Sequence, residues 1–283
     1  MDNLFWISFL ATIVFFLLGI VIGRRTHLCH PSTNLENAHT KSKIFIFIVL
    51  IIFISFLFMV MIVRNDTILE TMPLLFQKFS TLLMWTFFAM LVTFTSGYIG
   101  AIALLIKKPF MSYIPSLLLL NTLFYILFFR INQPIYTLVS SALPKNNGFL
   151  QSTNYSCTSA SIATIALSYN KKIDEKYISY LSGLSKFGAT SAQIRYTLNK
   201  LHLNYTTLTN IAHKLNKIEP PAIIYIDHPS LGVESHAVAY LDYNDTSYKI
   251  WDPLQGAKVI LKSKMNHIWH GNGIKVYPFI KVP

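Results

Sequence analysis

The chain contains few charged residues and only two cysteines. Of its 283 residues, 13% are charged and 53% are hydrophobic, and the mean hydropathy is +0.45. A soluble domain rarely has this composition, and the hydrophobic excess is concentrated before residue 131. The composition therefore argues against a chain that is soluble throughout.

Four long apolar runs without a charged residue occupy the first half of the chain: residues 4–23, 44–63, roughly 80–106 and 111–129. Each has about 20 residues or more, enough at ~1.5 Å per residue to cross a ~30 Å hydrocarbon core. The first run has no basic n-region and no small-residue cleavage pattern, so it does not resemble a removable signal peptide. We predict an α-helical transmembrane anchor of about four helices over residues 1–130, a linker over 131–147 and a globular domain over 148–283.

The short loops between these runs predict an orientation. The first and third loops carry the clearest Lys and Arg content, from Arg24, Arg25, Lys41, Lys43, Lys107 and Lys108. Such loops usually face the cytoplasm. Both termini and the globular domain would then lie on the non-cytoplasmic side of a bacterial inner membrane.

The basic net charge of +12 does not indicate a nucleic-acid-binding protein. After residue 130 the Lys and Arg residues are spread out, and no basic run is longer than two residues. This distribution is more typical of solubility and of attraction to anionic lipid headgroups. We expect a lipid bilayer, and no nucleic acid, among the partners.

Cys157 is a lone thiol if this orientation is right. Cys29 would lie on the opposite membrane face, so the two cysteines could not form a disulfide within one monomer. A spare thiol is a liability in an oxidising compartment. The ordinary interpretation of Cys157 is a buried core cysteine, and the alternative is a thiol with a chemical role. The residues around Cys157 decide between these two interpretations.

Helical patterns come first in the second half, and strand patterns follow them. The helical patterns cover Cys157–Tyr169, Glu175–Leu181 and Ser191–Leu201, and the strand patterns cover Ala222–Ile226, His236–Tyr243, Tyr248–Trp251 and Lys258–Leu261. This order predicts an α+β domain with an antiparallel sheet.

Four residues of this domain have the chemistry of a thiol catalyst. Cys157 would begin a helix, whose positive end favours a thiolate. His236 begins one strand and Asp252 ends the next, and a turn of two or three residues would place them opposite each other or one residue out of register. Gln151 could donate a side-chain amide hydrogen bond to an oxyanion. Each residue alone has an ordinary structural interpretation, but this order and spacing favour catalysis.

The arrangement resembles the bacteriocin-processing cysteine peptidases, which are double-glycine leader peptidases of cysteine peptidase family 39 with a papain-like fold. The resemblance covers nearly all of residues 148–262 and rests on Gln151 six residues before Cys157, on HAVAYLDY after His236 and on WDPLQG around Asp252. It implies that Cys157 is the nucleophile and His236 the general base and acid. It also implies that Asp252 orients His236 and that Gln151 is the oxyanion donor.

The chain departs from the family pattern in two ways. Ser156 and Thr158 stand where the family usually has an acidic residue and a glycine or alanine. The sequence also has no GxxxxGK[ST] motif, unlike family members fused to an ATP-driven exporter. We therefore do not carry over leader cleavage coupled to export.

The sequence predicts a membrane-anchored cysteine peptidase that cleaves a secreted or membrane-associated peptide or protein precursor, with no cofactor. The alternatives are a catalytically silent module that binds a leader or partner, and an acyltransferase that uses the same residues. The short motifs HLCH (from His27) and HIWH (from His267) offer too few ligands for a metal site.

Overall fold

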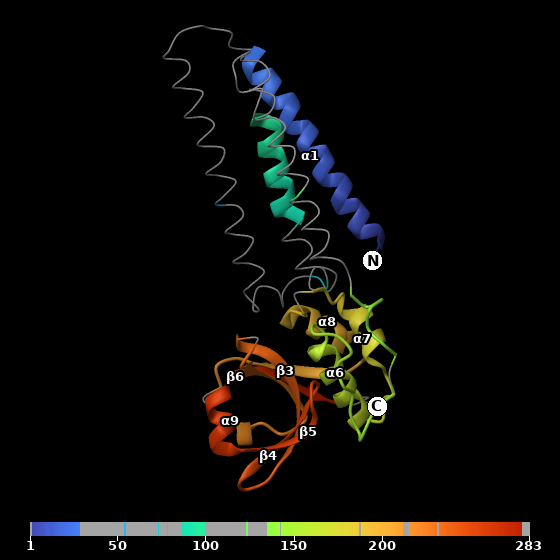
Figure 1. The fold of residues 1–283 in the computed structure, drawn as a ribbon, viewed down its shortest axis with the longest axis vertical. Coiled ribbons are helices and arrows are strands. Elements are labelled where there is room, and N and C mark those ends of the chain that lie inside the picture. Colours follow the sequence, from blue (N-terminus) through green and yellow to red (C-terminus); the bar gives the residue numbers. More distant parts are fainter. Residues whose placement is uncertain are drawn as a thin grey trace. The chain divides into compact units, whose positions relative to one another are not determined.

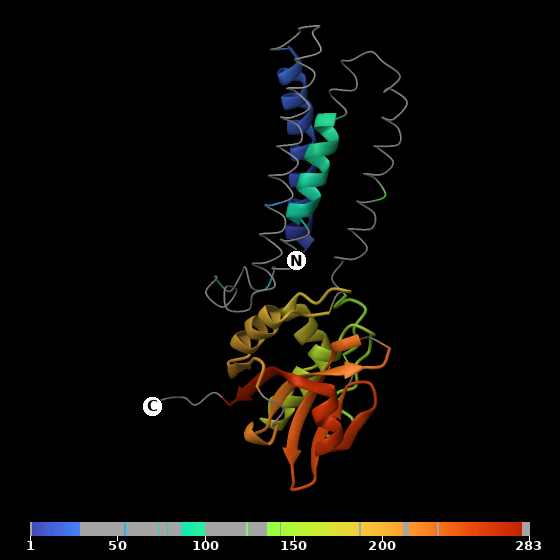
Figure 2. The same cartoon turned by 90° about the vertical axis from the view of Figure 1, so that its left-hand side faces the viewer.

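The computed structural model describes residues 2–28, 54, 73, 78, 86–99, 123, 135–141, 143–186, 188–211, 215–230 and 232–278. The chain divides into two compact units (Figures 1 and 2). The first consists of Met1–Met72 and Phe79–Asn132, and the second of Pro73–Lys78 and Gln133–Pro283. The second unit contains all four candidate catalytic residues.

The first unit contains α1 (Asp2–Leu28) and a helix over residues 86–99. The two helices approach closely, because a Cβ atom added to Gly19 or Gly97 would collide with the backbone of the other helix. The predicted run 4–23 lies within α1, whereas nearly all of 44–63 and 111–129 lies outside the described residues. In the part of the chain that the structure describes, no helix combines the length and the apolar character needed to cross a membrane.

The second unit is built on a six-stranded antiparallel sheet with the strand order β1-β6-β2-β3-β4-β5. The strands are β1 (Asn204–Leu208), β2 (Ala222–His228), β3 (Gly232–Tyr243), β4 (Ser247–Asp252), β5 (Gly256–Leu261) and β6 (Trp269–Tyr277). The four strands β2 to β5 follow one another along the chain and across the sheet, and β6 returns to pair with both β1 and β2. The predicted α+β domain with an antiparallel sheet is confirmed.

Three helices precede the sheet strands β2 to β6: α6 (Cys157–Ser168), α7 (Glu175–Ser182) and α8 (Ser191–Lys200). Their ends follow local capping chemistry. The Asp174 side chain accepts the Tyr177 N–H at the start of α7, and Thr190 and Gln193 form a reciprocal capping box at the start of α8. The three predicted helices are thus confirmed to within one residue at each end.

The sequence patterns missed the strands β1 and β6, the short helix α9 (Lys262–Ile268) and the 3₁₀ turn η2 (Leu215–Lys217). Strand β6 has the sequence WHGNGIKVY, and its two glycines weaken the usual signal of β-branched and aromatic residues. It is nonetheless an inner strand of the sheet, because β1 and β2 pair with its two edges.

The sheet has a hydrophobic cluster on each face. The cluster under α6 contains Ile223, Ala237, Ala239 and Trp251, and the cluster on the other face contains alternate residues of the same strands together with Met265 of α9. The helices α6 to α8 and the helix α9 lie on opposite sides of the sheet (Figures 1 and 2). This packing fixes α6, which begins with Cys157, against the strands that carry His236 and Asp252.

One buried hydroxyl joins α6 to the segment before it. Thr164 Oγ1 accepts the Phe149 N–H at 3.0 Å, and Trp251 Nε1 donates to Phe149 O at 2.7 Å. Thr164→Val leaves the buried N–H without an acceptor, which costs about 1–3 kcal/mol. We expect amide hydrogen exchange across residues 148–168 of the full-length protein to become roughly 5- to 100-fold faster, as measured by mass spectrometry.

The matched control is Thr206→Val, since the exposed Thr206 hydroxyl makes only a 3.4 Å contact with the Tyr277 hydroxyl. This variant should change the exchange of its own strand by less than about 0.5 kcal/mol. Equal effects of the two substitutions would show that the buried hydrogen bond does not stabilise the start of the domain.

Candidate active site

Cys157 is the first residue of α6 and is partly buried. Burial alone would raise the pKa of its thiol. The nearby His236, the Ala237 N–H and the Thr158 hydroxyl together outweigh burial and hold the pKa of Cys157 below its ordinary value. The nucleophile predicted from the sequence therefore lies where its thiolate is stabilised.

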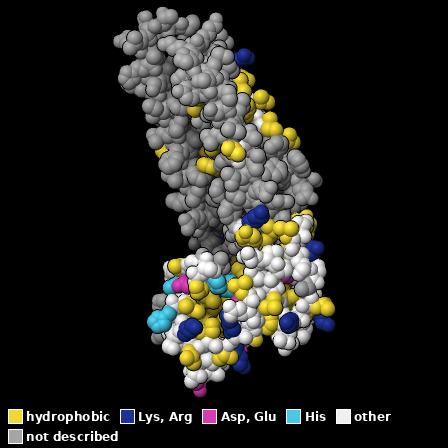
Figure 3. All heavy atoms as spheres, viewed as in Figure 1, with side chains coloured by type: hydrophobic (Ala, Val, Ile, Leu, Met, Phe, Trp, Pro, Cys, Tyr) yellow, Lys and Arg dark blue, Asp and Glu magenta, His cyan; other side chains and the backbone are white. Residues whose placement is uncertain are grey.

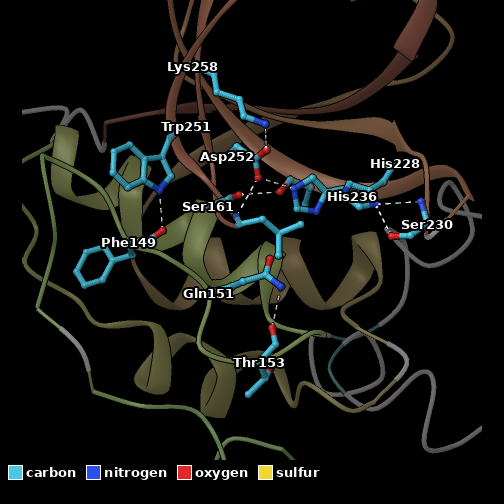
Figure 4. A network of polar contacts seen from close by, with 12 residues as sticks. Phe149, Gln151, Thr153, Ser161, His228, Ser230, His236, Trp251, Asp252 and Lys258 are labelled. Atoms are coloured by element: carbon cyan, nitrogen blue, oxygen red, sulfur yellow. Dashed lines mark hydrogen bonds and ion pairs between the residues drawn. The ribbon is translucent and has the colours of Figure 1, made fainter.

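His236 is a buried residue of β3, only 1% exposed. Its Nε2 donates to Asp252 Oδ1 over 2.8 Å (Figure 4). Burial alone would lower the pKa of the imidazole, but the hydrogen bond to Asp252 and the neighbouring Cys157 thiol raise it to about 9. His236 is consequently an imidazolium at neutral pH when Cys157 is ionised.

The second ring nitrogen of His236, Nδ1, is the one available to the thiol. It is buried and has no hydrogen-bond partner among the residues that the structure describes. Because Nε2 is engaged by Asp252, Nδ1 is the ring nitrogen that remains for Cys157, which also raises the pKa of His236. The arrangement is that of a thiolate–imidazolium pair in which a carboxylate hydrogen-bonds the ring nitrogen that does not face the thiol.

Asp252 is the last residue of β4 and is also buried. Its Oδ1 accepts the Leu254 N–H at 2.9 Å, and its Oδ2 accepts Lys258 Nζ at 2.6 Å. Burial alone would raise the pKa of this carboxyl, but the hydrogen bonds from His236, Lys258 and Leu254 lower it far below its ordinary value. Asp252 thus stays charged over the whole range in which His236 titrates.

The predicted register between His236 and Asp252 was wrong, although the two side chains do meet. Ala239 pairs with Trp251, so the next step along the ladder places Asp252 opposite Val238, two residues from His236. The turn is longer than predicted, since Tyr243 pairs with Tyr248, and β3 has an irregularity between Tyr240 and Asp242. His236 and Val238 share one face of the sheet, so the contact is diagonal across the strands.

Gln151 lies beside the same strand end, because its backbone N–H donates to Pro253 O at 2.8 Å. Its side-chain Nε2 donates to Thr153 O at 2.8 Å, which leaves one N–H of the amide for another acceptor (Figure 4). The buried Oε1 has no hydrogen-bond partner among the described residues. The hydrogen bond to Thr153 in the same loop therefore constrains the orientation of the Gln151 amide.

The sequence analysis missed two neighbours of the His236–Asp252 pair. Lys258 of β5 pairs with Ile250, which places it diagonally across from Asp252. The His228 ring contacts the edge of the His236 ring with centroids 5.2 Å apart, and Ser230 hydrogen-bonds His228 Nδ1 (Figure 4). The position of Lys258 next to Asp252 could have been predicted only from the register of the β4–β5 hairpin. No local sequence pattern indicated that His228 lies next to His236.

Of the two histidine motifs that the sequence analysis set aside, the structure describes HIWH fully and HLCH only in part. His27 belongs to α1, and Cys29 and His30 lie outside the described residues. In the HIWH motif, His270 Nε2 hydrogen-bonds Asp227 Oδ2 at 3.0 Å. Among the residues that the structure describes, no group of three or more His, Cys, Asp or Glu side chains could hold a metal ion.

Basic side chains are scattered over the face of the domain that Figure 3 shows. On the face shown in Figure 3, the Lys and Arg side chains of the described residues lie apart from one another among polar and hydrophobic side chains. The pairs on this domain, such as Lys249 with Asp242 at 2.9 Å, further offset the positive charge locally. No continuous basic stripe crosses the face in view.

Comparison with known proteins adds a family. Residues 145–278 match the sequence profile of the Peptidase C39 family. A curated relative, the colicin V secretion/processing ATP-binding protein CvaB of Escherichia coli, is 27% identical over 128 residues, which are 45% of this chain and 18% of CvaB. The chain thus matches less than a fifth of the length of that relative.

Two solved structures also align with about half of the chain. A double glycine motif protease from an AMS/PCAT transporter, in complex with the leader peptide, has a TM-score of 0.43 and 20% identity over 50% of this chain and 96% of its own. The peptidase domain of Streptococcus ComA has a TM-score of 0.43 and 20% identity over 47% of this chain and 99% of its own.

The family profile covers every one of the four candidate residues, from Gln151 to Asp252. Residues 145–278 are therefore a cysteine peptidase domain of the Peptidase C39 family.

Proposed function

We propose that this domain hydrolyses peptide bonds with Cys157 as the nucleophile and His236 as the general acid and base. Asp252 orients His236, and the Gln151 amide donates to the oxyanion. The observation that carries the proposal is the buried 2.8 Å hydrogen bond between His236 and Asp252, next to a thiol at the start of α6 whose pKa is lowered.

The reaction follows from these groups. The Cys157 thiolate attacks the carbonyl carbon and forms a C–S bond, and the carbonyl oxygen takes the negative charge, which the free N–H of Gln151 stabilises. When the C–N bond breaks, the His236 imidazolium gives its proton to the leaving amine. Neutral His236 then takes a proton from water, the resulting hydroxide attacks the thioester, and the thiolate leaves.

The substrate class we propose is an extended segment of a peptide or protein precursor. The family is that of double-glycine leader peptidases, and the name of the relative CvaB describes secretion and processing of colicin V. A peptide with two glycines before the cleaved bond is therefore the first substrate to test.

We also propose that the first half of the chain anchors the domain to a membrane, with the domain on the non-cytoplasmic side. The support is in the sequence: the runs 44–63 and 111–129 are apolar and uncharged, and basic residues gather in the first and third loops. An anchor would keep the peptidase near substrates at the membrane and so raise their effective concentration.

Removal of the proposed catalytic groups should reduce peptide cleavage, and the size of the loss should depend on which group is removed. We expect Cys157→Ala to reduce cleavage of a Gly-Gly peptide to background, a loss of about 10³-fold or more. Asp252→Asn should cost less than Cys157→Ala, because the amide can still accept from His236 but lacks the charge that raises the pKa of the imidazole. Mass spectrometry of the products gives both rates.

The matched control is Asp242→Asn, which neutralises an exposed carboxylate of β3 that pairs with Lys249 and should leave cleavage within twofold or so. Reaction in H₂¹⁸O with an added amine separates the rival functions. Heavy oxygen in the new carboxylate indicates hydrolysis, and an amide product indicates acyl transfer. Tight peptide binding by wild type without either product would favour the silent module.

The pH dependence of thiol alkylation tests the ion pair directly. The pKa of Cys157 is lowered, so wild-type Cys157 should react with iodoacetamide at a pH where an ordinary thiol is protonated. His236→Ala removes the positive partner and leaves burial, which raises the thiol pKa, so its labelling curve should move to higher pH. Mass spectrometry of labelled Cys157 gives the curves, and superimposable curves would contradict the proposal.

The anchor is tested on membranes and intact cells. The full-length chain should stay in the membrane pellet after alkaline carbonate extraction, and release into the supernatant would exclude an integral anchor. For orientation we choose Val259→Cys in a background that also carries Cys29→Ala and Cys157→Ala, since Val259 is 68% exposed and Cys29 would otherwise report the opposite membrane face. An impermeant maleimide should label this variant on intact cells, whereas labelling only after lysis would place the domain inside.

A further inference from the structure

Glu175 is a buried carboxylate that the proposed reaction does not use. It is the first residue of α7 and is fully buried. A carboxylate in such a place is costly unless hydrogen bonds compensate its lost hydration. Its two oxygens lie 3.0 and 3.2 Å from the Ser152 N, so one backbone N–H of the loop that carries Gln151 donates into the carboxylate.

The other end of this loop also lies near Glu175. Burial raises the pKa of the Glu175 carboxyl, and the Ser156 hydroxyl near it partly offsets this rise. Ser156 is the residue before Cys157 and the N-cap of α6, where its side chain makes no capping bond to the helix. A single carboxylate from α7 is thus connected to the neighbours in sequence of both Gln151 and Cys157.

Hydrogen bonds inside the loop connect Ser156 to the Gln151 amide. The Thr153 N–H and hydroxyl donate to Ser156 Oγ at 3.2 and 2.9 Å, and Thr153 O accepts Gln151 Nε2 at 2.8 Å. The Ser156 hydroxyl itself donates to Thr153 O at 3.1 Å, so Thr153 O accepts from both Ser156 and Gln151. Glu175 therefore binds the loop through the Ser152 N–H, and hydrogen bonds inside the loop join Ser156 and Thr153 to the side chain of Gln151.

We infer that Glu175 is a positioning residue that fixes the loop 151–156, and with it the Gln151 amide, relative to Cys157. The inference rests on the proposed function, in which that amide stabilises the oxyanion. Glu175 does not touch the reacting atoms. Its loss would misplace a donor that must meet the oxyanion at hydrogen-bonding distance, and misplacement by about 1 Å can cost ~100-fold in rate.

A role in thiol activation predicts a different outcome from a role in positioning the donor. The groups that lower the pKa of Cys157 are His236, the Ala237 N–H and Thr158, and none of them belongs to the loop 151–156. Alkylation by iodoacetamide forms no oxyanion, whereas peptide cleavage does. A positioning role should therefore slow cleavage while leaving alkylation unchanged.

The experiment compares Glu175→Ala with Glu175→Gln in the full-length protein, using the Gly-Gly peptide and iodoacetamide. Glu175→Ala should lower kcat/KM by about 10- to 100-fold, mainly through kcat, and change the alkylation rate by less than about twofold at each pH. Glu175→Gln should retain most activity, because its amide oxygen can still accept the Ser152 N–H. The matched control is Glu219→Ala, since the Glu219 side chain is 84% exposed.

A double-mutant cycle with Gln151→Ala identifies the route of the effect. If Glu175 acts through the amide, Glu175→Ala should cost less than about threefold once Gln151 is already alanine. A full additive loss, or slowed alkylation in proportion to cleavage, would overturn the inference and indicate a general defect of folding or of the thiol.

Hydrogen exchange keeps the inference testable if the wild type cleaves nothing. In that case the proposed function fails, and the hold of Glu175 on the loop is measured separately. Amide exchange in peptides covering residues 151–156 should accelerate by about tenfold or more in Glu175→Ala and stay near the wild-type rate in Glu175→Gln and Glu219→Ala. Unchanged exchange in Glu175→Ala would show that the carboxylate does not fix the loop.

Discussion

The contact between α6 and β3 is the interaction on which the site depends. Three polar residues of α6 at helical spacing, Cys157, Ser161 and Thr164, lie on one stripe of the helix. The first is stabilised by the Ala237 N–H, the second donates to Ala237 O at 3.1 Å, and the third accepts the Phe149 N–H. A helix held at three successive turns can neither rotate nor slide, so the sulfur stays beside His236 although the two residues are far apart in sequence.

The charges around this contact balance one another, which makes their burial tolerable. The Cys157 thiolate and the Asp252 carboxylate flank the His236 imidazolium, and Lys258 supplies the second positive charge at 2.6 Å from Asp252. Buried charges cost several kcal/mol each unless they are paired and hydrogen-bonded. The same pairing sets the chemistry, because the low pKa of Asp252 keeps His236 protonated and a protonated His236 keeps Cys157 ionised.

Periodicity and spacing predicted what depends on local sequence. The helix that begins at Cys157 and the strands around His236 and Asp252 follow from apolar patterns that the structure preserves. The register between these strands did not follow, because the Asn244 side chain accepts the Thr246 and Ser247 N–H groups and closes a longer turn than expected. Strand β6 and the contacts of Lys258 and Glu175 were also missed, since each depends on which distant segments the fold brings together.

The two halves of the site are supported in different ways. Cys157, His236 and Asp252 are fixed by a helix and by strands that pair over several residues, with one register shift in each ladder. Gln151 is fixed by a loop whose order rests on a few polar contacts made by Thr153, Ser156 and Glu175. In the proposed mechanism, activation of the thiol and stabilisation of the oxyanion are therefore separable. A change confined to the loop would then leave a reactive, ionised cysteine that no longer cuts peptides efficiently. The presence of Cys157, His236 and Asp252 alone is thus a weaker indicator of peptidase activity than their presence together with an ordered loop.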